Sequence, residues 1–157
     1  MAAFRLSHGN YLRWRKQMTR ELTEQEKKQR DRRNRLKVSI YADRSVWIAG
    51  KGTGPICPIC GKIIRGVGNM HEALLSKMLA PGENQHCIND RRNCVILHPT
   101  CHVPGIGGND ILKKCFDYLC EWEGKDYVMA WLESMRIYWP TATGQIIQRI
   151  KNLEQEI

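Results

Sequence analysis

NCVILHPTCH, residues 93–102, is the stretch that decides the fold, because it joins a predicted strand to a predicted metal-binding turn. Residues 95–97 are apolar and mostly β-branched, which predicts a short buried strand. His98 and Cys101 follow with two residues between them and offer one nitrogen and one sulfur ligand. His102 comes directly after Cys101, so residues 98–102 supply three side chains of metal-binding type.

A second pair of ligands lies about forty residues upstream. Cys57 and Cys60 form a CPIC motif that is followed by a glycine, and this pattern predicts a tight turn that presents two thiolates to one ion. Together with His98 and Cys101 they make a set of three cysteines and one histidine, which closes a tetrahedral structural zinc site. We therefore predict that these four residues bind Zn²⁺, and that His102 has a separate task.

Pro99 predicts that a short helix begins at the second ligand pair, since the φ angle of proline is fixed near the helical value. In such a helix His98 and Cys101 lie near one face, and His102 is rotated from Cys101 by about 100°. This arrangement aims His102 away from the zinc ion. The glycines that follow at 105–108 predict that the helix is short.

Three segments of the chain resemble the HNH endonucleases, most closely their zinc-clipped, phage-type members. The segments are CPIC at 57–60, MHEAL at 70–74 and NCVILHPTCH at 93–102. The three letters of the family name fall on His71, Asn93 and His102. The resemblance covers about residues 55–104, and it implies a small ββα-metal fold that hydrolyses DNA phosphodiester bonds, by nicking or cutting, with low sequence specificity.

The resemblance also implies a role for each of these residues. His71 is expected to be the general base, and His102 the ligand of a catalytic divalent cation such as Mg²⁺, Mn²⁺ or Ni²⁺. The chemistry agrees, because phosphodiester hydrolysis needs a base for water and a cation for the developing charge, and a histidine suits the first task. Asn93 is expected to fix the loop or to orient the base through its amide.

One departure from the family pattern leaves two assignments open. Met70 stands where many members have a metal-binding Asp or His, and a thioether does not bind a hard cation. Either His71 is the base, which we favour, or His71 binds the metal and Glu72 acts as the base or holds the water. The plainer alternatives are a core histidine at 71, a solvated carboxylate at 72 and a spare zinc ligand at 102.

Positive charge is concentrated in the first part of the chain. The 157 residues carry a net charge of +9, and residues 1–44, with thirteen Lys or Arg and five Asp or Glu, contribute +8 of it. Such a run is usually a solvated face, but a nuclease must also hold a polyanion through phosphate contacts. The candidate DNA contacts are Arg13, Arg15, Lys16, Arg30, Arg32, Arg33 and Arg35 in this arm, and Arg91 and Arg92 in the polar loop before Asn93.

Helix signals flank the metal-binding segment on both sides. In the arm, Thr23 and Glu26 have the spacing of a capping box. Caps and apolar spacing predict further helices that begin at Asn109 or Asp110, at Asp126 and at Thr143, the first ending near Gly124 and the second before Pro140. The glycine-rich residues 50–55 are predicted to be a linker.

We therefore predict a mainly helical α+β protein with a small ββα-metal core. The expected parts are a basic helical arm at 1–50, the zinc-clipped HNH core at 51–108, and helices at 109–157 that pack on the core. The apolar face of the last helix packs either on that core or against a second copy, so the oligomeric state stays open. Seven cysteines without a secretory leader or a membrane span favour a reducing compartment, and we expect a cytoplasmic protein.

The expected partner is DNA, and the resemblance adds phage packaging proteins and a phage or prophage origin. Two other functions fit the same sequence. A non-catalytic zinc-stabilised nucleic-acid-binding module would use the basic arm, with Met70 marking a decayed active site. A structural component of a phage assembly would instead bind an acidic protein through that arm.

Overall fold

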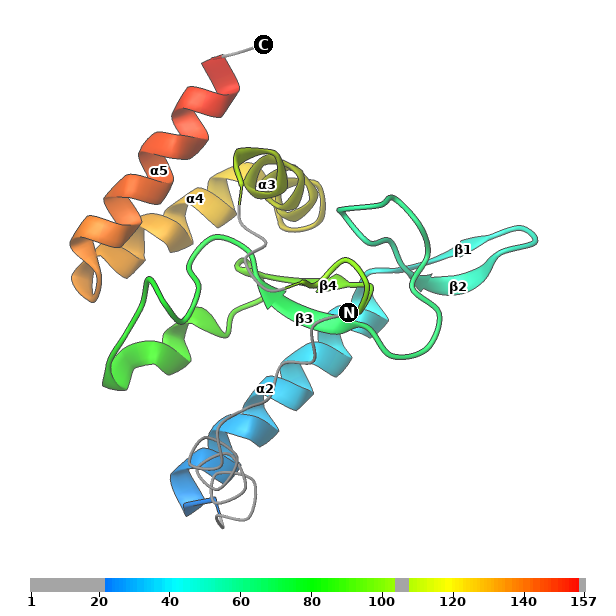
Figure 1. Ribbon diagram of the computed structural model, residues 1–157, viewed down its shortest axis with the longest axis horizontal. Coiled ribbons are helices and arrows are strands. Elements are labelled where there is room, and N and C mark those ends of the chain that lie inside the picture. The colour runs from blue at the N-terminus through cyan, green and yellow to red at the C-terminus, as the bar shows by residue number, and fades with distance from the viewer. Residues whose placement is uncertain (1–21, 104–107, 156–157) are drawn as a thin grey trace, which may run out of the picture. The chain divides into compact units, whose positions relative to one another are not determined.

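Short antiparallel strands and longer helices make up the protein in the computed structural model, which describes residues 22–103 and 108–155 (Figure 1). Two units divide the chain, residues 1–32 and residues 33–157. The class is mixed α+β with more helix than strand, as predicted. Of the predicted DNA contacts, Arg13, Arg15 and Lys16 lie outside the described residues.

The helix α2 (Glu24–Asp43) begins at the predicted capping box. The Glu26 N–H donates to Oγ1 of Thr23 at 3.2 Å, and the Thr23 N–H donates to Oε2 of Glu26 at 2.7 Å. These reciprocal bonds satisfy amide groups that have no partner within the helix. The capping box therefore fixes where α2 starts.

A hairpin of β1 (Ser45–Ile48) and β2 (Gly52–Pro55) occupies the place of the predicted linker, so that prediction is wrong. Gly50 and Gly52 have φ angles of 72° and 87°, in the left-handed region that glycine adopts without strain. The glycines therefore serve the turn between two strands, and the same residues that suggested a flexible linker make the hairpin possible.

The second hairpin pairs β3 (Asn69–Glu72) with β4 (Cys94–Leu97) in an antiparallel register that sets His71 opposite Val95. All four residues of β4 are buried, and the prediction of a buried strand at residues 95–97 is confirmed. The connection between the two strands contains the 3-10 helix η1 (Glu83–Ile88). This hairpin carries His71 on one strand and leads, through the other, to the second pair of metal ligands.

A single turn follows β4, where Pro99 predicts a short helix. The N–H groups of Cys101 and His102 donate to the carbonyl oxygen of His98 at 2.9 and 3.0 Å. Among the described residues the next helix is α3, which begins at Asn109. In the described part of the chain, the helix of the expected ββα motif is thus a single turn. Proline and glycines follow closely in the sequence, and they disfavour a longer helix.

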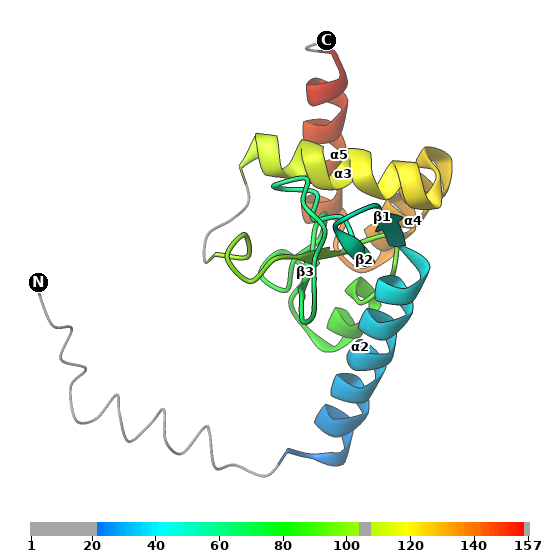
Figure 2. The same cartoon turned by 90° about the vertical axis from the view of Figure 1, so that its right-hand side faces the viewer.

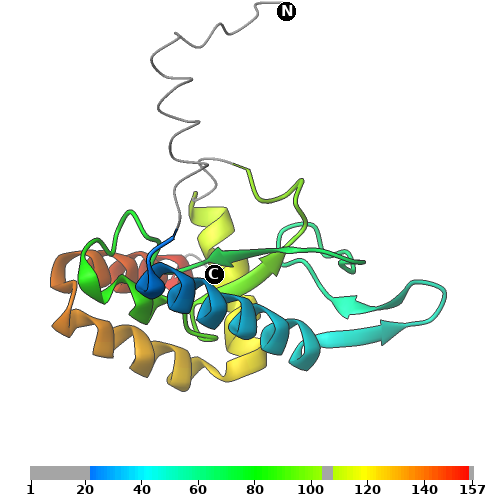
Figure 3. The same cartoon turned by 90° about the horizontal axis from the view of Figure 1, so that it is seen from below.

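The C-terminal part consists of α3 (Asn109–Glu123), α4 (Lys125–Ser134), the 3-10 turn η2 (Met135–Ile137) and α5 (Pro140–Gln155). Gly124, with a φ of 89°, ends α3 where predicted. The last helix begins at Pro140 and not at the predicted Thr143, because proline suits the first helical turn, where its missing N–H has no helical partner. Figure 2 shows α3 crossing α5, and Figure 3 shows α4 beside α5.

The hydrophobic core of residues 33–157 joins these helices to the β3–β4 hairpin, and α3 packs on β4. Ile146 and Ile150 of α5 are buried in it, which assigns the apolar face of that helix to the core. Their burial confirms the first of the two predicted uses of this face. Across the described ranges, none of the helices has both the length and the apolar character that a membrane span needs.

Arg44 is an arginine with 0% of its surface exposed, at the junction of α2 and β1. Its guanidinium donates to the carbonyl oxygens of Cys94 and Arg91, at 2.8 and 2.7 Å, and to Oε1 of Glu123 at 2.8 Å. Glu123 is itself 8% exposed. The ion pair therefore connects the end of α2, the start of β4 and the last turn of α3 inside the protein.

Replacing Arg44 by Met should lower the free energy of unfolding by about 3–5 kcal/mol, because it leaves a buried carboxylate and two buried carbonyl groups with fewer partners. Urea denaturation of the zinc-loaded protein measures this loss. Arg136→Met is the matched control, since Arg136 forms an exposed ion pair with Glu133 and should change little. Equal effects of the two substitutions would contradict a structural role for the buried pair.

Candidate metal centre and histidine pair

Four predicted ligands meet at one point of the structure. The sulfur atoms of Cys57, Cys60 and Cys101 and a ring nitrogen of His98 all lie within 4.8 Å of one another. Zinc bonds of about 2.0 to 2.3 Å bring tetrahedral ligand atoms to comparable separations. The cluster, which we name the Cys3His cluster, is therefore suited to a metal ion such as zinc, as predicted from the spacing of its residues.

The first half of the Cys3His cluster is a tight backbone turn. The Gly61 N–H donates to the Cys57 carbonyl oxygen at 2.8 Å, and the Cys57 N–H donates to the Lys62 carbonyl oxygen at 2.9 Å. Gly61 has a φ of 67°, a conformation that favours glycine. The glycine after CPIC thus lets the chain reverse so that Cys57 and Cys60 face the same point.

The His98 ring is held on both of its nitrogen sides. Its Nδ1 lies 3.2 Å from Sγ of Cys60, and its Nε2 lies 3.2 Å from the carbonyl oxygen of Ile63. We assign the proton to Nε2, which then donates to this carbonyl and leaves Nδ1 as the metal ligand. The carbonyl therefore fixes both the tautomer and the orientation of the ring.

The other cysteines have different surroundings. Burial raises the pKa of the Cys94 and Cys115 thiols to about 12, and that of Cys120 to about 11. These thiols stay protonated at neutral pH, whereas metal ligation needs the thiolate. Within residues 22–103 and 108–155, the Cys3His cluster is the one group of three or more such side chains placed to share an ion.

His71 and His102 lie next to each other beside this cluster. Their ring centroids are 5.2 Å apart and the ring planes meet at 65°. His71 comes from β3 and His102 from the turn that carries Cys101, so the same turn that completes the Cys3His cluster also sets the place of His102. The structure thus brings together the two histidines to which the resemblance gives chemical roles.

Asn69 is a neighbour of this pair that the sequence alone did not reveal. Its Nδ2 lies 3.5 Å from Nδ1 of His102. Asn69 and His71 are two positions apart on β3, so their side chains share one face of the strand. The period-two spacing before His71 was the available signal, but it gains meaning only when β3 is known to be a strand.

His71 is partly buried, and burial lowers the pKa of its ring below the ordinary value because desolvation disfavours the charged form. The nearby His102 lowers this pKa further by charge repulsion, the Glu72 carboxylate raises it, and Arg33 lowers it. The net shift is downward. The neutral ring, which accepts a proton, is therefore the dominant form at neutral pH.

The Glu72 side chain is engaged by an arginine. Glu72 forms an ion pair with Arg33 of α2, which also donates to Oδ1 of Asn89 at 3.0 Å and to the Met70 carbonyl oxygen at 3.2 Å. Arg33 was predicted as a DNA contact, and these three bonds direct its guanidinium to β3 and the loop after it. The pairing also occupies the Glu72 carboxylate with Arg33, which leaves its oxygens less available to hold a water.

Asn93 is fully buried and fixes the loop that follows β3. Its Oδ1 accepts from the N–H groups of Leu74 and Leu75, both at 2.9 Å. Its Nδ2 donates to the carbonyl oxygens of Leu75 and Ile88, at 2.8 and 2.9 Å. Every hydrogen-bonding position of the amide is used, so the side chain joins the two ends of the β3–β4 connection.

Arg91 and Arg92, two further predicted DNA contacts, form ion pairs within the protein. Arg91 binds Glu123 at 2.9 Å and Asp43 at 3.0 Å, and Arg92 binds Asp90 at 2.7 Å. These carboxylates offset much of the positive charge of Arg91 and Arg92, which would otherwise attract a phosphate group. Of the predicted contacts that fall within the described residues, those exposed are Arg30, Arg32 and Arg35.

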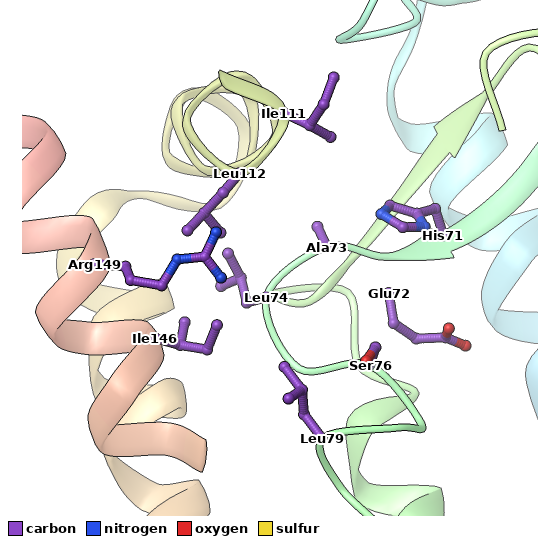
Figure 4. A pocket seen from close by; sticks show the side chains of 10 residues that line it. All are labelled: His71, Glu72, Ala73, Leu74, Ser76, Leu79, Ile111, Leu112, Ile146 and Arg149. Atoms are coloured by element: carbon purple, nitrogen blue, oxygen red, sulfur yellow. The ribbon is translucent and has the colours of Figure 1, made fainter. Parts of the chain in front are cut away.

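A cleft of about 100 Å³ opens beside His71. Figure 4 shows that His71 and Arg149 line it from different elements, the first from β3 and the second from α5. Leu74, Leu112 and Ile146 form its apolar wall. The candidate base thus faces a small cavity that has a cationic side chain in its lining.

Comparisons with protein-family models, with curated proteins and with solved structures gave no match to the chain. The interpretation of the site therefore depends on its residues. These are the Cys3His cluster, the pair of His71 and His102, and the asparagines that hold the strands around them.

The purified protein should contain one zinc ion per chain, and Cys101→Ser should lose it, because a three-ligand set binds zinc much more weakly than a closed site. Metal analysis after gel filtration measures the content. Cys87→Ser is the matched control, since Cys87 is also partly buried but lies outside the cluster. Zinc retained in full by Cys101→Ser would contradict the assignment.

The ring of His71 should titrate below its ordinary pKa of about 6.5 in the folded, zinc-loaded protein. The unfolded chain then takes up this proton first, so the free energy of unfolding falls as the pH drops through 6.5 and stops falling below the folded pKa. Nuclear magnetic resonance of the ring protons gives the pKa directly. His102→Ala should raise it, His86→Ala should leave it unchanged, and a value above 6.5 would refute the assigned cause.

Proposed function

We propose that the protein is a metal-dependent HNH endonuclease that hydrolyses DNA phosphodiester bonds. The observation that carries the proposal is the pair of His71 and His102, with ring centroids 5.2 Å apart, beside the Cys3His cluster. A base and a cation ligand must both reach one phosphate group in this reaction. Two neighbouring imidazole rings meet that need. One of them, His102, lies on the turn that also carries Cys101 of the Cys3His cluster.

His71 is proposed to take the proton from the attacking water. Its lowered pKa keeps the ring neutral at the pH of a cell, so Nδ1 or Nε2 is free to accept a proton. The cleft beside it gives the water and the phosphate a place next to the ring. Glu72 is the weaker candidate for the base, because its carboxylate is paired with Arg33.

His102 is proposed to bind the catalytic cation. Such a cation would stabilise the charge that develops on the phosphate and on the leaving 3′ oxygen. The Asn69 amide lies beside the His102 ring, and water and phosphate oxygens would supply most other ligands of the cation. An imidazole ligand suits Ni²⁺ or Mn²⁺ better than Mg²⁺, and Ni²⁺ should bind most tightly of the three.

The DNA strand is proposed to meet the exposed arginines of α2, which are Arg30, Arg32 and Arg35. Contacts from such side chains go to phosphate groups and carry no sequence information. Low sequence specificity and strong dependence on salt are therefore expected of the enzyme.

A non-catalytic nucleic-acid-binding module is the second candidate. It is favoured by the surroundings of the histidine pair, where Glu72 is held by Arg33 and Met70 is buried in the core. Among the described residues, His102 also belongs to no group of three or more His, Cys, Asp or Glu side chains placed to share an ion. In this function the Cys3His cluster would serve the fold, and the arginines of α2 would bind the nucleic acid.

Supercoiled plasmid tests the two candidates against each other. Zinc-loaded protein with added Ni²⁺, Mn²⁺ or Mg²⁺ should nick the plasmid, most strongly with Ni²⁺ or Mn²⁺, and EDTA should abolish nicking. His71→Ala and His102→Ala should each slow it by about 100-fold or more. His86→Ala is the control, since that ring contacts the Glu83 carbonyl away from the pair and should leave the rate unchanged.

Glu72→Gln separates the two assignments of the base. If His71 is the base, this substitution should change the rate far less than His71→Ala does, although it also removes the ion pair with Arg33. A loss as large as that of His71→Ala would favour the shifted assignment. Wild-type protein that binds DNA and zinc but nicks with none of the cations would move the conclusion to the non-catalytic module.

A further inference from the structure

The β1–β2 hairpin carries exposed side chains that the proposed reaction does not use. Trp47 of β1 has 72% of its surface exposed, and Lys51 in the turn is exposed as well. Arg65, also exposed, follows in the segment after the CPIC turn. We propose that the hairpin and Arg65 bind a single-stranded stretch of DNA, with the two cations on phosphate groups and Trp47 stacked on a base. The proposal rests on the proposed function for the identity of the ligand and adds a contact surface for the strand.

The first support is the fixed place of Arg65 beside the hairpin. The N–H of Ile64 donates to the carbonyl oxygen of Pro55 at 2.8 Å, and the carbonyl oxygen of Ile64 accepts from the Tyr41 hydroxyl at 2.9 Å. A Cβ atom on Gly54 would lie 2.2 Å from that carbonyl oxygen, so glycine in β2 is what allows the two backbones to approach. The segment that carries Arg65 is therefore held against the hairpin.

The second support is that the two cations border one hollow. Lys51 and Arg65 both line an open hollow of about 440 Å³ along the turn of the hairpin, and Thr53 lines it too. Thr53 is directly opposite Trp47 in the antiparallel register. Directly opposite residues project from the same face of a strand pair, so the indole and the Thr53 side chain lie on one face, next to the hollow. The aromatic ring and the two cations thus gather at one end of the hairpin.

The third support is the charge of this part of the chain. Residues 45–71 contain no Asp or Glu, and their cations are Lys51, Lys62 and Arg65. In the part of the chain that the structure describes, ion pairs form between other side chains, so no carboxylate cancels the charge of Lys51 or Arg65. A surface with uncancelled positive charge attracts a polyanion.

The exposed indole selects the form of the nucleic acid. Surfaces that bind single strands combine cations for the backbone with aromatic rings on which bases stack. In a duplex the faces of each base are covered by its neighbours, so an indole reaches a base face only where the strands are apart. Figures 1 and 3 show the β1–β2 hairpin extending beyond α3, α4 and α5, where a strand can approach it. The combination of Trp47 with cations therefore favours single-stranded DNA.

The first experiment measures the role of the indole. Zinc-loaded, full-length protein without added cation is titrated with a labelled oligothymidylate, and binding is followed by fluorescence anisotropy. Trp47→Ala should weaken binding about tenfold or more, and Trp47→Phe should weaken it less, because a phenyl ring still stacks on a base. Tyr138→Ala is the matched control, an exposed aromatic residue outside the hairpin, and should bind as wild type.

The second experiment measures the role of the cations through the dependence of binding on salt. Each phosphate contact to a single strand contributes about 0.7 to the slope of log affinity against log salt concentration. Lys51→Gln and Arg65→Gln should therefore each reduce this slope by about 0.7. Lys151→Gln is the control, an exposed cation on α5, and should leave the slope unchanged. All variants should keep the zinc content and the thermal unfolding of the wild type, since the replaced side chains are exposed.

Three results would overturn the proposal. The first is oligothymidylate binding by Trp47→Ala that is as tight as that of the wild type. The second is a duplex of oligothymidylate with oligodeoxyadenylate that binds as tightly as the single strand and with the same dependence on Trp47. The third is displacement of the labelled strand by polyglutamate as readily as by unlabelled strand, which would assign the surface to an acidic protein.

Plasmid nicking separates this proposal from the nuclease function. If strand binding depends on Trp47 but the wild type nicks with none of the cations, the hairpin surface stands and the nuclease function fails. If the wild type nicks and Trp47→Ala both nicks and binds the single strand as the wild type does, the nuclease function stands and the role of the hairpin is refuted.

Discussion

The buried charge of Arg44 constrains the rest of residues 33–157. A guanidinium with no exposed surface has to keep its partners, because an unpaired charge in the interior costs several kcal/mol. Its partners are the carbonyl oxygens of Arg91 and Cys94 and the carboxylate of Glu123. The end of α2, the start of β4 and the last turn of α3 therefore hold one arrangement, and β4 leads from that point to His98 of the Cys3His cluster.

Both ends of β4 are thus fixed, and these fixed ends determine the positions of His71 and His102. Before the strand, Asn93 holds the loop after β3 with four hydrogen bonds, which determines how the chain leaves His71. After the strand, the Cys3His cluster holds the turn that carries His102. The 5.2 Å between the two rings is a result of these separate supports, since each ring comes from an element held by different contacts.

Local signals in the sequence were sufficient for part of this structure. The CPIC motif and the pair of His98 and Cys101 predicted the cluster, because ligand spacing is set by one turn of backbone, and the Thr23 capping box predicted the start of α2. The Arg33–Glu72 and Arg44–Glu123 pairs join residues 39 and 79 positions apart, and no local pattern marks them. The glycines of residues 50–55 led to the wrong prediction of a linker, since hairpin turns and linkers are both rich in glycine.

The separation of the two halves of the Cys3His cluster has a consequence for the order of folding. Each half is a turn that forms quickly and locally, but about forty residues of chain, with both strands of the β3–β4 hairpin, lie between them. Closing that loop costs conformational entropy that grows slowly with its length. A zinc ion that first binds Cys57 and Cys60 would be attached to a chain that is not yet folded. Pairing of β3 with β4 would then bring His98 and Cys101 to this bound ion.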